Sequence, residues 1–128
     1  MYAFEWTPDY VAWFYDDVEV ERVTSDSPSV QDLDKEQHVM MNFWTPTFDK
    51  WANGFSNAGM PWYARYDYVE TYTWNGGSDF SLHWRDDFDN FDSNRWIKSD
   101  NWSFGGNSTT FMASQVYTEN GALVLKMQ

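Results

Sequence analysis

A chain of 128 residues with 42% hydrophobic side chains has the size of one domain and can bury a single core. Its 8 Lys and Arg residues against 20 Asp and Glu residues give a net charge of −12, which excludes the basic surface that nucleic acids and anionic membranes require. Cysteine is absent, so disulfides, thiolate nucleophiles and cysteine metal sites are excluded as well.

The first part of the chain predicts a β-hairpin. Residues 10–15 form a continuous apolar and aromatic run, and residues 18–23 return with valines at positions 18, 20 and 23. Asp16-Asp17 between them suits a two-residue turn. Residues 24–36 are rich in Ser, Asp and Pro and predict an exposed loop. The apolar run 39–44 is short enough for a buried strand.

The second part of the chain is also dominated by strand signals. Gly, Asn and Pro at residues 53–61 predict a surface loop, and residues 62–72 predict one long aromatic strand. Residues 75–79 read as a linker or a loop. A new block begins at residues 80–84, and further strands are predicted near residues 102–104, 110–116 and 122–127. The pattern favours an all-β fold, an antiparallel two-sheet β-sandwich that forms a single domain over residues 1–128.

Aromatic residues make up 21% of the chain, more than a core of this size needs. Sugars present apolar faces between polar edges, so a sugar-binding cleft combines exposed aromatic rings with amide, carboxylate or guanidinium groups. Burial in the core is the alternative for any single ring. The candidates for substrate binding are Trp6, Trp13, Trp44, Trp84, Trp102 and Asn107.

The acidic residues offer two weaker candidates. Asp17, Glu19 and Glu21 alternate along one predicted strand, so all three are expected on one face, as the carboxylate pair of a glycosidase would be. A solvated face is favoured, because Val18 and Val20 are assigned to the buried side. The acidic run at residues 86–92 could chelate a hard cation, but a solvated loop is again favoured. No catalytic residue is assigned.

Several segments together resemble glycoside hydrolase family 16, near the bacterial lichenases that cleave β-1,3-1,4-glucan. Residues 2–13, 40–44 and 64–69 are similar to the C-terminal half of that family. Residues 77–80, 92–96 and 120–125 are similar to its N-terminal strands. The two groups follow one another in the order of a circular permutant, and the resemblance covers practically the whole chain.

The resemblance implies a jelly-roll sandwich with a β-glucan cleft on its concave face. It places four of the candidate tryptophans in or behind the cleft, namely Trp6, Trp13, Trp84 and Trp102. It also makes Asn107 a polar contact to the polysaccharide or oligosaccharide. It also implies a structural calcium on the convex side, with Asp67 as a side-chain ligand and backbone carbonyls near Asp87 and Gly121. The family is extracellular, whereas residues 1–9 show no signal peptide. The roughly 18 apolar residues of a membrane span are absent, so no membrane partner is expected.

One departure from the family decides the functional expectation. The family takes its nucleophile and its acid/base from a Glu-x-Asp-x-Glu strand, and that pattern occurs nowhere in this sequence. The jelly roll is therefore expected to be incomplete, and the chain alone is expected to be inactive. Three roles stay open: the substrate-holding part of an enzyme with a complementing chain, a non-catalytic β-glucan-binding module, or a remnant that forms homo-oligomers.

Overall fold

The structure, a computed structural model, describes residues 1–52 and 54–128, without the side chains of residues 49 and 52. The strands are β1 (Tyr2–Trp6), β2 (Tyr10–Tyr15), β3 (Val18–Thr24), β4 (Trp62–Tyr66), β5 (Val69–Gly76), β6 (Asp79–Asp86), β7 (Val116–Thr118) and β8 (Leu123–Met127). The helical turns are α1 (Pro28–Gln31), α2 (Asp49–Ala52) and the 3₁₀ turn Ala113–Gln115.

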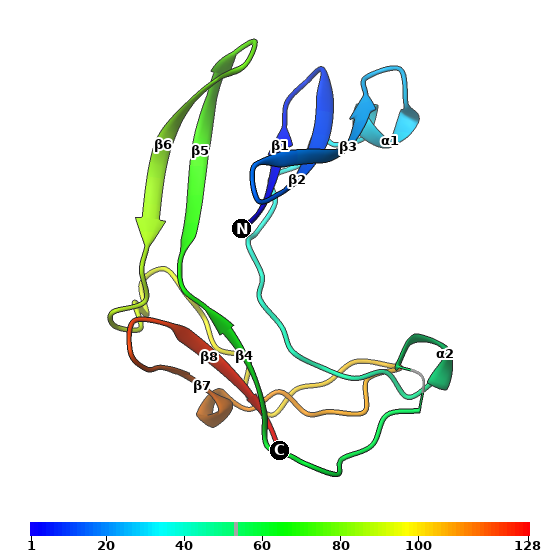
Figure 1. The fold of residues 1–128 in the computed structure, drawn as a ribbon, viewed down its shortest axis with the longest axis vertical. Coiled ribbons are helices and arrows are strands. Elements are labelled where there is room, and N and C mark those ends of the chain that lie inside the picture. The colour runs from blue at the N-terminus through cyan, green and yellow to red at the C-terminus, as the bar shows by residue number, and fades with distance from the viewer. Residues whose placement is uncertain (53) are drawn as a thin grey trace. The chain divides into compact units, whose positions relative to one another are not determined.

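Every strand pairing in the described part of the chain is antiparallel (Figure 1). This confirms the predicted fold class, an all-β chain whose antiparallel sheets are consistent with a jelly-roll sandwich. The chain divides into two compact units, Met1–Val39 (unit 1) and Met40–Gln128 (unit 2).

Unit 1 is built on a three-stranded sheet in the order β1-β2-β3. Asp16 and Asp17 join β2 to β3 with φ angles of +46° and +64°. Both angles lie in the left-handed region that a type I′ hairpin turn requires, and Asp tolerates that region better than most residues. The predicted hairpin is therefore confirmed at the predicted turn.

The side-chain placement in β3 differs from the prediction. Val18 and Val20, which were assigned to the buried side, are 64% and 63% exposed. Val18 pairs with Tyr15, which pairs in turn with Tyr2, so these residues share one face of the sheet. Tyr2 and Tyr15 are exposed as well, so this face of the sheet is uncovered. The bulge between Trp13 and Phe14 also breaks the simple alternation expected along β3.

Unit 2 contains a three-stranded sheet in the order β4-β8-β7 and the two-stranded hairpin β5-β6. Residues 75–79 form the end of β5, the turn and the start of β6. The β7–β8 connection turns at Asn120 and Gly121, whose φ angles are +53° and +70°. The same turn geometry thus recurs at Asp16-Asp17 and here, each time between antiparallel strands.

Several predicted strands of unit 2 are corrected by the structure. Residues 110–116 hold the isolated bridge from Phe111 to Trp102 and the 3₁₀ turn Ala113–Gln115, and β7 begins only at Val116. Residues 62–72 belong to two strands instead of one, because β4 ends at Tyr66 and β5 begins at Val69. β4 pairs with β8, whereas β5 pairs with β6. Residues 39–44 are not in a strand. Only part of this apolar run is sheltered: Met40 is exposed, whereas Met41 and Phe43 pack against the core.

The core of unit 2 centres on three buried side chains, Phe88, Leu123 and Leu125. Leu123 and Leu125 lie two residues apart on β8 and therefore face the same side of the sheet. Phe88 comes from the loop after β6 and is fully buried. The partly buried side chains around them are Met41, Phe43, Ala64, Tyr66, Val69, Phe91, Trp96 and Val116. This core fixes the loops that carry the candidate site.

Candidate functional site

Four aromatic rings of unit 2, Trp44, Trp102, Phe104 and Phe111, form what we call the aromatic cluster. The rings of Trp102 and Phe111 are stacked, with centroids 5.8 Å apart and planes 19° apart. Phe104 lies 5.8 Å from Trp102 and meets Trp44 edge to face at 5.0 Å. Trp102 is 53% exposed, so the cluster combines mutual packing with an open ring.

Backbone pairing between distant segments holds the cluster together. Trp102 and Phe111 form an isolated antiparallel bridge, with backbone N–H···O distances of 2.8 and 3.3 Å. A second bridge joins Pro46 to Asn107, and the Ser108 N–H donates to the Thr45 carbonyl at 2.8 Å. The segment after Trp44 is thereby tied to the loop that carries Asn107. Two of the predicted residues, Trp44 and Trp102, are thus brought into one cluster beside Asn107.

Sequence reasoning missed two members of the cluster, Phe104 and Phe111. Phe104 follows Trp102 at a spacing of two, a signal that could have placed both rings on one face of an extended segment. Phe111 is aligned with Trp102 by the bridge between them, and no local pattern indicates that pairing.

Asn107 supplies the polar group beside the rings. Its side-chain Oδ1 accepts hydrogen bonds from the backbone N–H of Thr109 at 2.8 Å and from its hydroxyl at 2.7 Å. Its Nδ2 is sheltered and has no partner among the described residues, and the same holds for the Thr45 hydroxyl. Sheltered donors are normally satisfied by protein, water or ligand, so the Asn107 amide and the Thr45 hydroxyl can each still form a hydrogen bond.

Trp84 lies on β6 and belongs to a different group of side chains. Its ring meets Trp96 edge to face at 5.9 Å, and the Arg95 guanidinium sits 4.2 Å from its centroid. The Trp96 Nε1–H donates to the Asp86 carboxylate at 2.6 Å. One face of Trp84 is therefore occupied by a cation–π contact, and the ring is less open than Trp102.

The acidic run at residues 86–92 begins on β6 and continues into the loop that follows. Asp86 accepts from Trp96 and from the backbone N–H of Phe88 at 2.9 Å, so it orders the turn that places Phe88 in the core. Asp87 binds Arg85, with a 2.7 Å hydrogen bond from Nε, and this guanidinium lowers the pKa of the Asp87 carboxyl. Asp86 is partly sheltered at the end of β6, whereas Asp87 and Asp89 are exposed on the loop that follows, in keeping with the expected solvated loop.

Trp6 and Trp13 lie in unit 1, on the same face of the β1–β2 pair. Trp6 pairs with Val11, and Trp13 pairs with Phe4, so the register places all four side chains on one side. Trp13 is 41% exposed and Trp6 is half-buried. The predicted substrate-binding residues are therefore divided between the two units.

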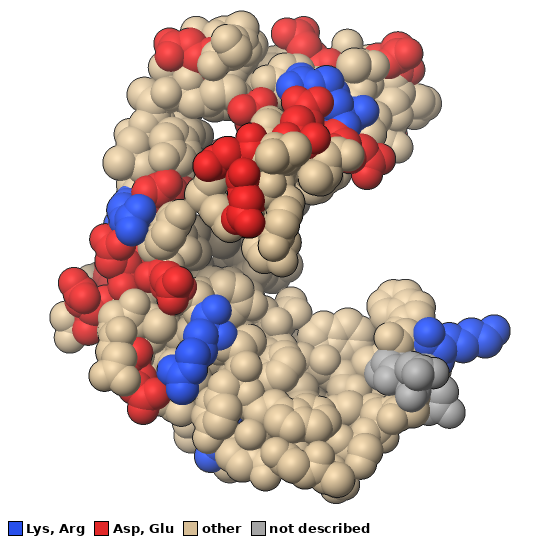
Figure 2. Space-filling view, in the orientation of Figure 1, with Lys and Arg blue, Asp and Glu red and all other residues tan. Residues whose placement is uncertain are grey.

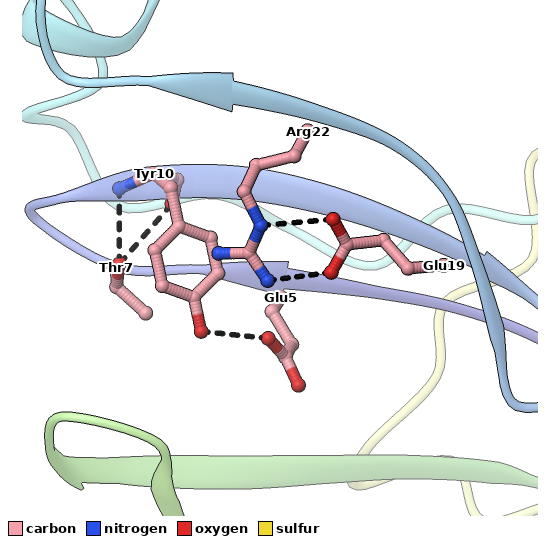
Figure 3. A network of polar contacts seen from close by, with 5 residues as sticks. All are labelled: Glu5, Thr7, Tyr10, Glu19 and Arg22. Atoms are coloured by element: carbon pink, nitrogen blue, oxygen red, sulfur yellow. Dashed lines mark hydrogen bonds and ion pairs between the residues drawn. The ribbon is translucent and has the colours of Figure 1, made fainter.

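The opposite face of this sheet carries a polar network (Figure 3). The Arg22 guanidinium binds the Glu19 carboxylate through two hydrogen bonds of 2.9 and 2.6 Å and stacks over the Tyr10 ring at 3.7 Å. The Tyr10 hydroxyl donates to Glu5 at 2.7 Å. Arg22 lowers the pKa of the Glu19 carboxyl, and the Glu5 contact raises the pKa of the Tyr10 hydroxyl.

The register overturns the expected carboxylate row. A bulge shifts the β2–β3 pairing between Trp13 and Phe14, so Glu21 pairs with Trp13 and Glu19 with Phe14. Neighbouring residues of β2 face opposite sides, so Glu19 and Glu21 also face opposite sides. Asp17 lies in the turn. These carboxylates do not form the single-face arrangement that a glycosidase needs.

Two of the residues implied for calcium, Asp67 and Gly121, flank the end of the β4–β8 pair. Tyr66 pairs with Leu123, so Asp67 just after β4 lies near Gly121 just before β8. The Asp89 carboxylate lies 3.9 Å from the position that a Cβ on Gly121 would take, so the loop carrying Asp87 also reaches this end. The Asp67 carboxylate is exposed, and oxygen ligands of this kind fit calcium.

Charge is unevenly distributed over the chain. Figure 2 shows acidic side chains gathered over β1–β3, and acidic and basic side chains together around β7 and β8. Across residues 1–52 and 54–128, no three His, Cys, Asp or Glu side chains form a group that could hold a metal ion. No described helix has the length and apolar character needed to cross a membrane.

The antiparallel sheets and the clustered, partly open rings define an all-β protein of the β-sandwich class. No protein-family model matches the chain. A beta-glucanase of Fibrobacter succinogenes is 34% identical over 131 residues, which cover 98% of this chain and 37% of that protein. A xylanase/beta-glucanase of Ruminococcus flavefaciens is 41% identical over 76 residues, covering 59% of this chain and 9% of that protein.

A beta-glucanase of Paenibacillus polymyxa is 39% identical over 75 residues, which cover 58% of this chain and 29% of that protein. The chain is therefore a homologue of bacterial beta-glucanases over nearly its whole length. It spans 37% of the length of the Fibrobacter relative and less of the other two.

Proposed function

We propose that this chain binds β-1,3-1,4-glucan as the substrate-holding part of a family 16 glycoside hydrolase and does not cleave the polysaccharide alone. The observation that carries the proposal is the aromatic cluster beside Asn107, in a chain homologous to beta-glucanases. Trp44, Trp102 and Asn107 are the residues that contact the sugar.

The chemistry of the cluster suits a glucan. The open ring of Trp102 offers a flat apolar surface to the CH face of a glucose unit, and its contact with Phe111 restrains the ring orientation before binding. The sheltered amide of Asn107 offers a donor to a hydroxyl at the edge of the sugar. Trp84 is a second platform, with the face opposite Arg95 as its binding surface.

Hydrolysis needs carboxylates that the sequence does not supply in the family pattern. Retaining glycosidases hold two carboxyl groups about 5 Å apart across the scissile bond. With Glu19 bound to Arg22 and Glu21 on the opposite face, the described carboxylates of unit 1 do not provide that pair. Cleavage by this chain therefore depends on a complementing polypeptide that carries the Glu-x-Asp-x-Glu strand.

The pattern of similarity supports a circularly permuted order. The Fibrobacter relative aligns with 98% of this chain, whereas the Paenibacillus relative aligns with 58%. A relative that shares a rearranged order aligns from end to end, but one with the original order aligns over one block only. The proposal includes secretion, as the family resemblance implies.

Calcium is proposed as a structural ion at the end of the β4–β8 pair. Asp67 would supply a carboxylate ligand, and the backbone around Asp87 and Gly121 would supply carbonyl oxygens. When bound, the ion would neutralise Asp67 and tie the β7–β8 turn to the loop after β6. It would take no part in the chemistry of hydrolysis.

Tryptophan fluorescence tests the binding proposal. Titration with a mixed-linkage β-glucan oligosaccharide is expected to change the emission saturably, because the sugar covers Trp102. A mannan oligosaccharide of equal length is the control. Emission that does not respond to saturating β-glucan oligosaccharide would contradict the proposed function.

A further inference from the structure

The two faces of the β1–β2–β3 sheet have opposite characters. One face carries the Glu5–Tyr10–Arg22–Glu19 network. The other carries mainly apolar side chains that are 41% to 84% exposed, and Glu21, which pairs with Trp13, is the carboxylate of β3 on that side. We call these residues the apolar face: Tyr2, Phe4, Trp13, Tyr15, Val18 and Val20. A sheet is normally stabilised by burying such a face against another layer.

The apolar face contains a shallow pocket of about 420 Å³. The rings of Tyr2 and Tyr15, 5.1 Å apart, contribute to its lining, and Phe4 and Trp13 lie opposite one another across the strands. The full lining is Tyr2, Ala3, Phe4, Trp13, Phe14, Tyr15 and Val20. The same surface therefore presents both projecting rings and a hollow that can accept a ring.

We propose that the apolar face is a dimer interface, on which a second copy of this chain packs sheet against sheet about a two-fold axis. A two-fold interface pairs one surface with itself, so it needs projections and hollows on the same patch, and the apolar face has both. Two antiparallel sheets that pack in this way form a sandwich with a shared core about 10 Å thick.

The size of the patch is close to what a stable dimer needs. With roughly 150 to 250 Å² per aromatic side chain, the exposed fractions of the four aromatic residues correspond to about 500 Å². The exposed parts of Val18 and Val20 add to this area. A standard protein interface buries about 800 Å² per partner. The Coulomb energy points to the same face, because two chains of net charge −12 repel, and the apolar face leaves the acidic network of each copy on the far side.

Charge also predicts an unusual salt dependence. An interface held by ion pairs weakens as salt screens the attraction, whereas this dimer has no ion pair in its central patch. Screening of the repulsion between two acidic chains is expected to tighten it. Raising NaCl from 50 to 500 mM is therefore expected to lower the dissociation constant of the dimer.

Sedimentation equilibrium of the full chain from 1 to 200 µM is the test. The unmodified chain is expected to dimerise, and Phe4→Lys and Val20→Lys are each expected to weaken the dimer by about 30-fold or more, as removal of an interface hot spot does. Leu82→Lys on β6 is the matched control, because Leu82 is 55% exposed on a strand of unit 2. Circular dichroism checks that each variant keeps its strands.

The sedimentation results separate the proposed dimer interface from its alternatives. Dimerisation that is lost in the Phe4 and Val20 variants but kept in the Leu82 variant supports the interface. A monomer at 200 µM would overturn it, and acrylamide quenching of Trp13 would then show whether unit 2 covers the face instead. Equal loss of dimerisation in all three variants would also overturn it. If both face variants unfold, the salt dependence of the unmodified chain decides, and a dimer that NaCl weakens would overturn the proposal.

A glucan oligosaccharide separates this proposal from the sugar-binding one. Trp13 cannot contact a second copy and a sugar at once, and we assign it to the second copy. Saturating mixed-linkage oligosaccharide is expected to leave the dimer intact. Dissociation by the sugar would assign the apolar face to the glucan and overturn the dimer interface.

Discussion

Replacing Trp102 by Ala removes the most open ring of the aromatic cluster. The ring is 53% exposed, so about 100 Å² of an aromatic side chain is available to a sugar. At about 25 cal/mol per Å², covering that area contributes about 2.5 kcal/mol. This value lies within the roughly 1 to 3 kcal/mol measured for the stacking of flat ligands on aromatic rings. The dissociation constant for the glucan is expected to rise about 70-fold.

Titration calorimetry with a mixed-linkage oligosaccharide measures the effect. The fold is expected to survive, because Trp102→Ala costs the ring contacts with Phe111 and Phe104, about 1 to 3 kcal/mol together. Trp51→Ala is the matched control, since Trp51 is 75% exposed on α2 and its ring contacts only Phe48 among the described aromatic pairs. Unchanged affinity in Trp102→Ala, or an equal loss in Trp51→Ala, would refute the assigned platform.

Three further outcomes are expected. Asp67→Asn abolishes a rise in melting temperature that calcium produces in the unmodified chain; a chelator without effect on that chain would contradict the ion site. Phe88→Ala lowers the free energy of unfolding by about 3 to 5 kcal/mol in urea, because Phe88 is fully buried, and a loss below about 1 kcal/mol would contradict the core. Arg22→Ala raises the pKa of Glu19 toward its usual value in a carboxyl NMR titration, because Arg22 lowers it, and an unchanged pKa would contradict the Arg22–Glu19 ion pair.

The sign of the last effect follows from the direction of the pKa shift. Because Arg22 lowers the folded-state pKa of Glu19, the pair stabilises unit 1 above the unfolded pKa of a glutamate, roughly 4.3. That stability is lost as the pH falls through the folded-state value. The Arg22→Ala variant is expected to show a smaller change of stability between pH 5 and pH 3.

Local sequence signals predicted the β2–β3 hairpin of this fold well. The turn at Asp16-Asp17 and strand β8 are specified by residues close together in the chain, through alternation and turn chemistry. The all-β class follows from the same signals. The similarity to beta-glucanases was also visible in the sequence, because it rests on contiguous motifs.

The errors arose where partners distant in sequence decide the structure. β4 and β5 are continuous in pattern, yet each pairs with a different strand, and no property of residues 62–72 reveals that choice. The single extra residue of the bulge beside Trp13 separated Glu19 from Glu21, since one step in register exchanges the faces. A run such as 39–44 forms a strand only where another strand pairs with it.

The candidate site was predictable in part for the same reason. Trp44, Trp102 and Asn107 were chosen by residue type, and the structure brings them together through the two isolated bridges. Trp84 carries a cation–π contact that composition could not indicate, because Arg95 reaches it from a loop. Phe111 was missed because its alignment with Trp102 is a tertiary contact.

The central claim is that this chain holds β-glucan without cleaving it, and one experiment on barley β-glucan tests both halves. The purified chain is incubated with the insoluble polymer, and the bound protein and the released reducing ends are measured in the same sample. The account predicts bound protein and no release of reducing ends above a protein-free control. Release by the chain alone, or no binding at all, would contradict it.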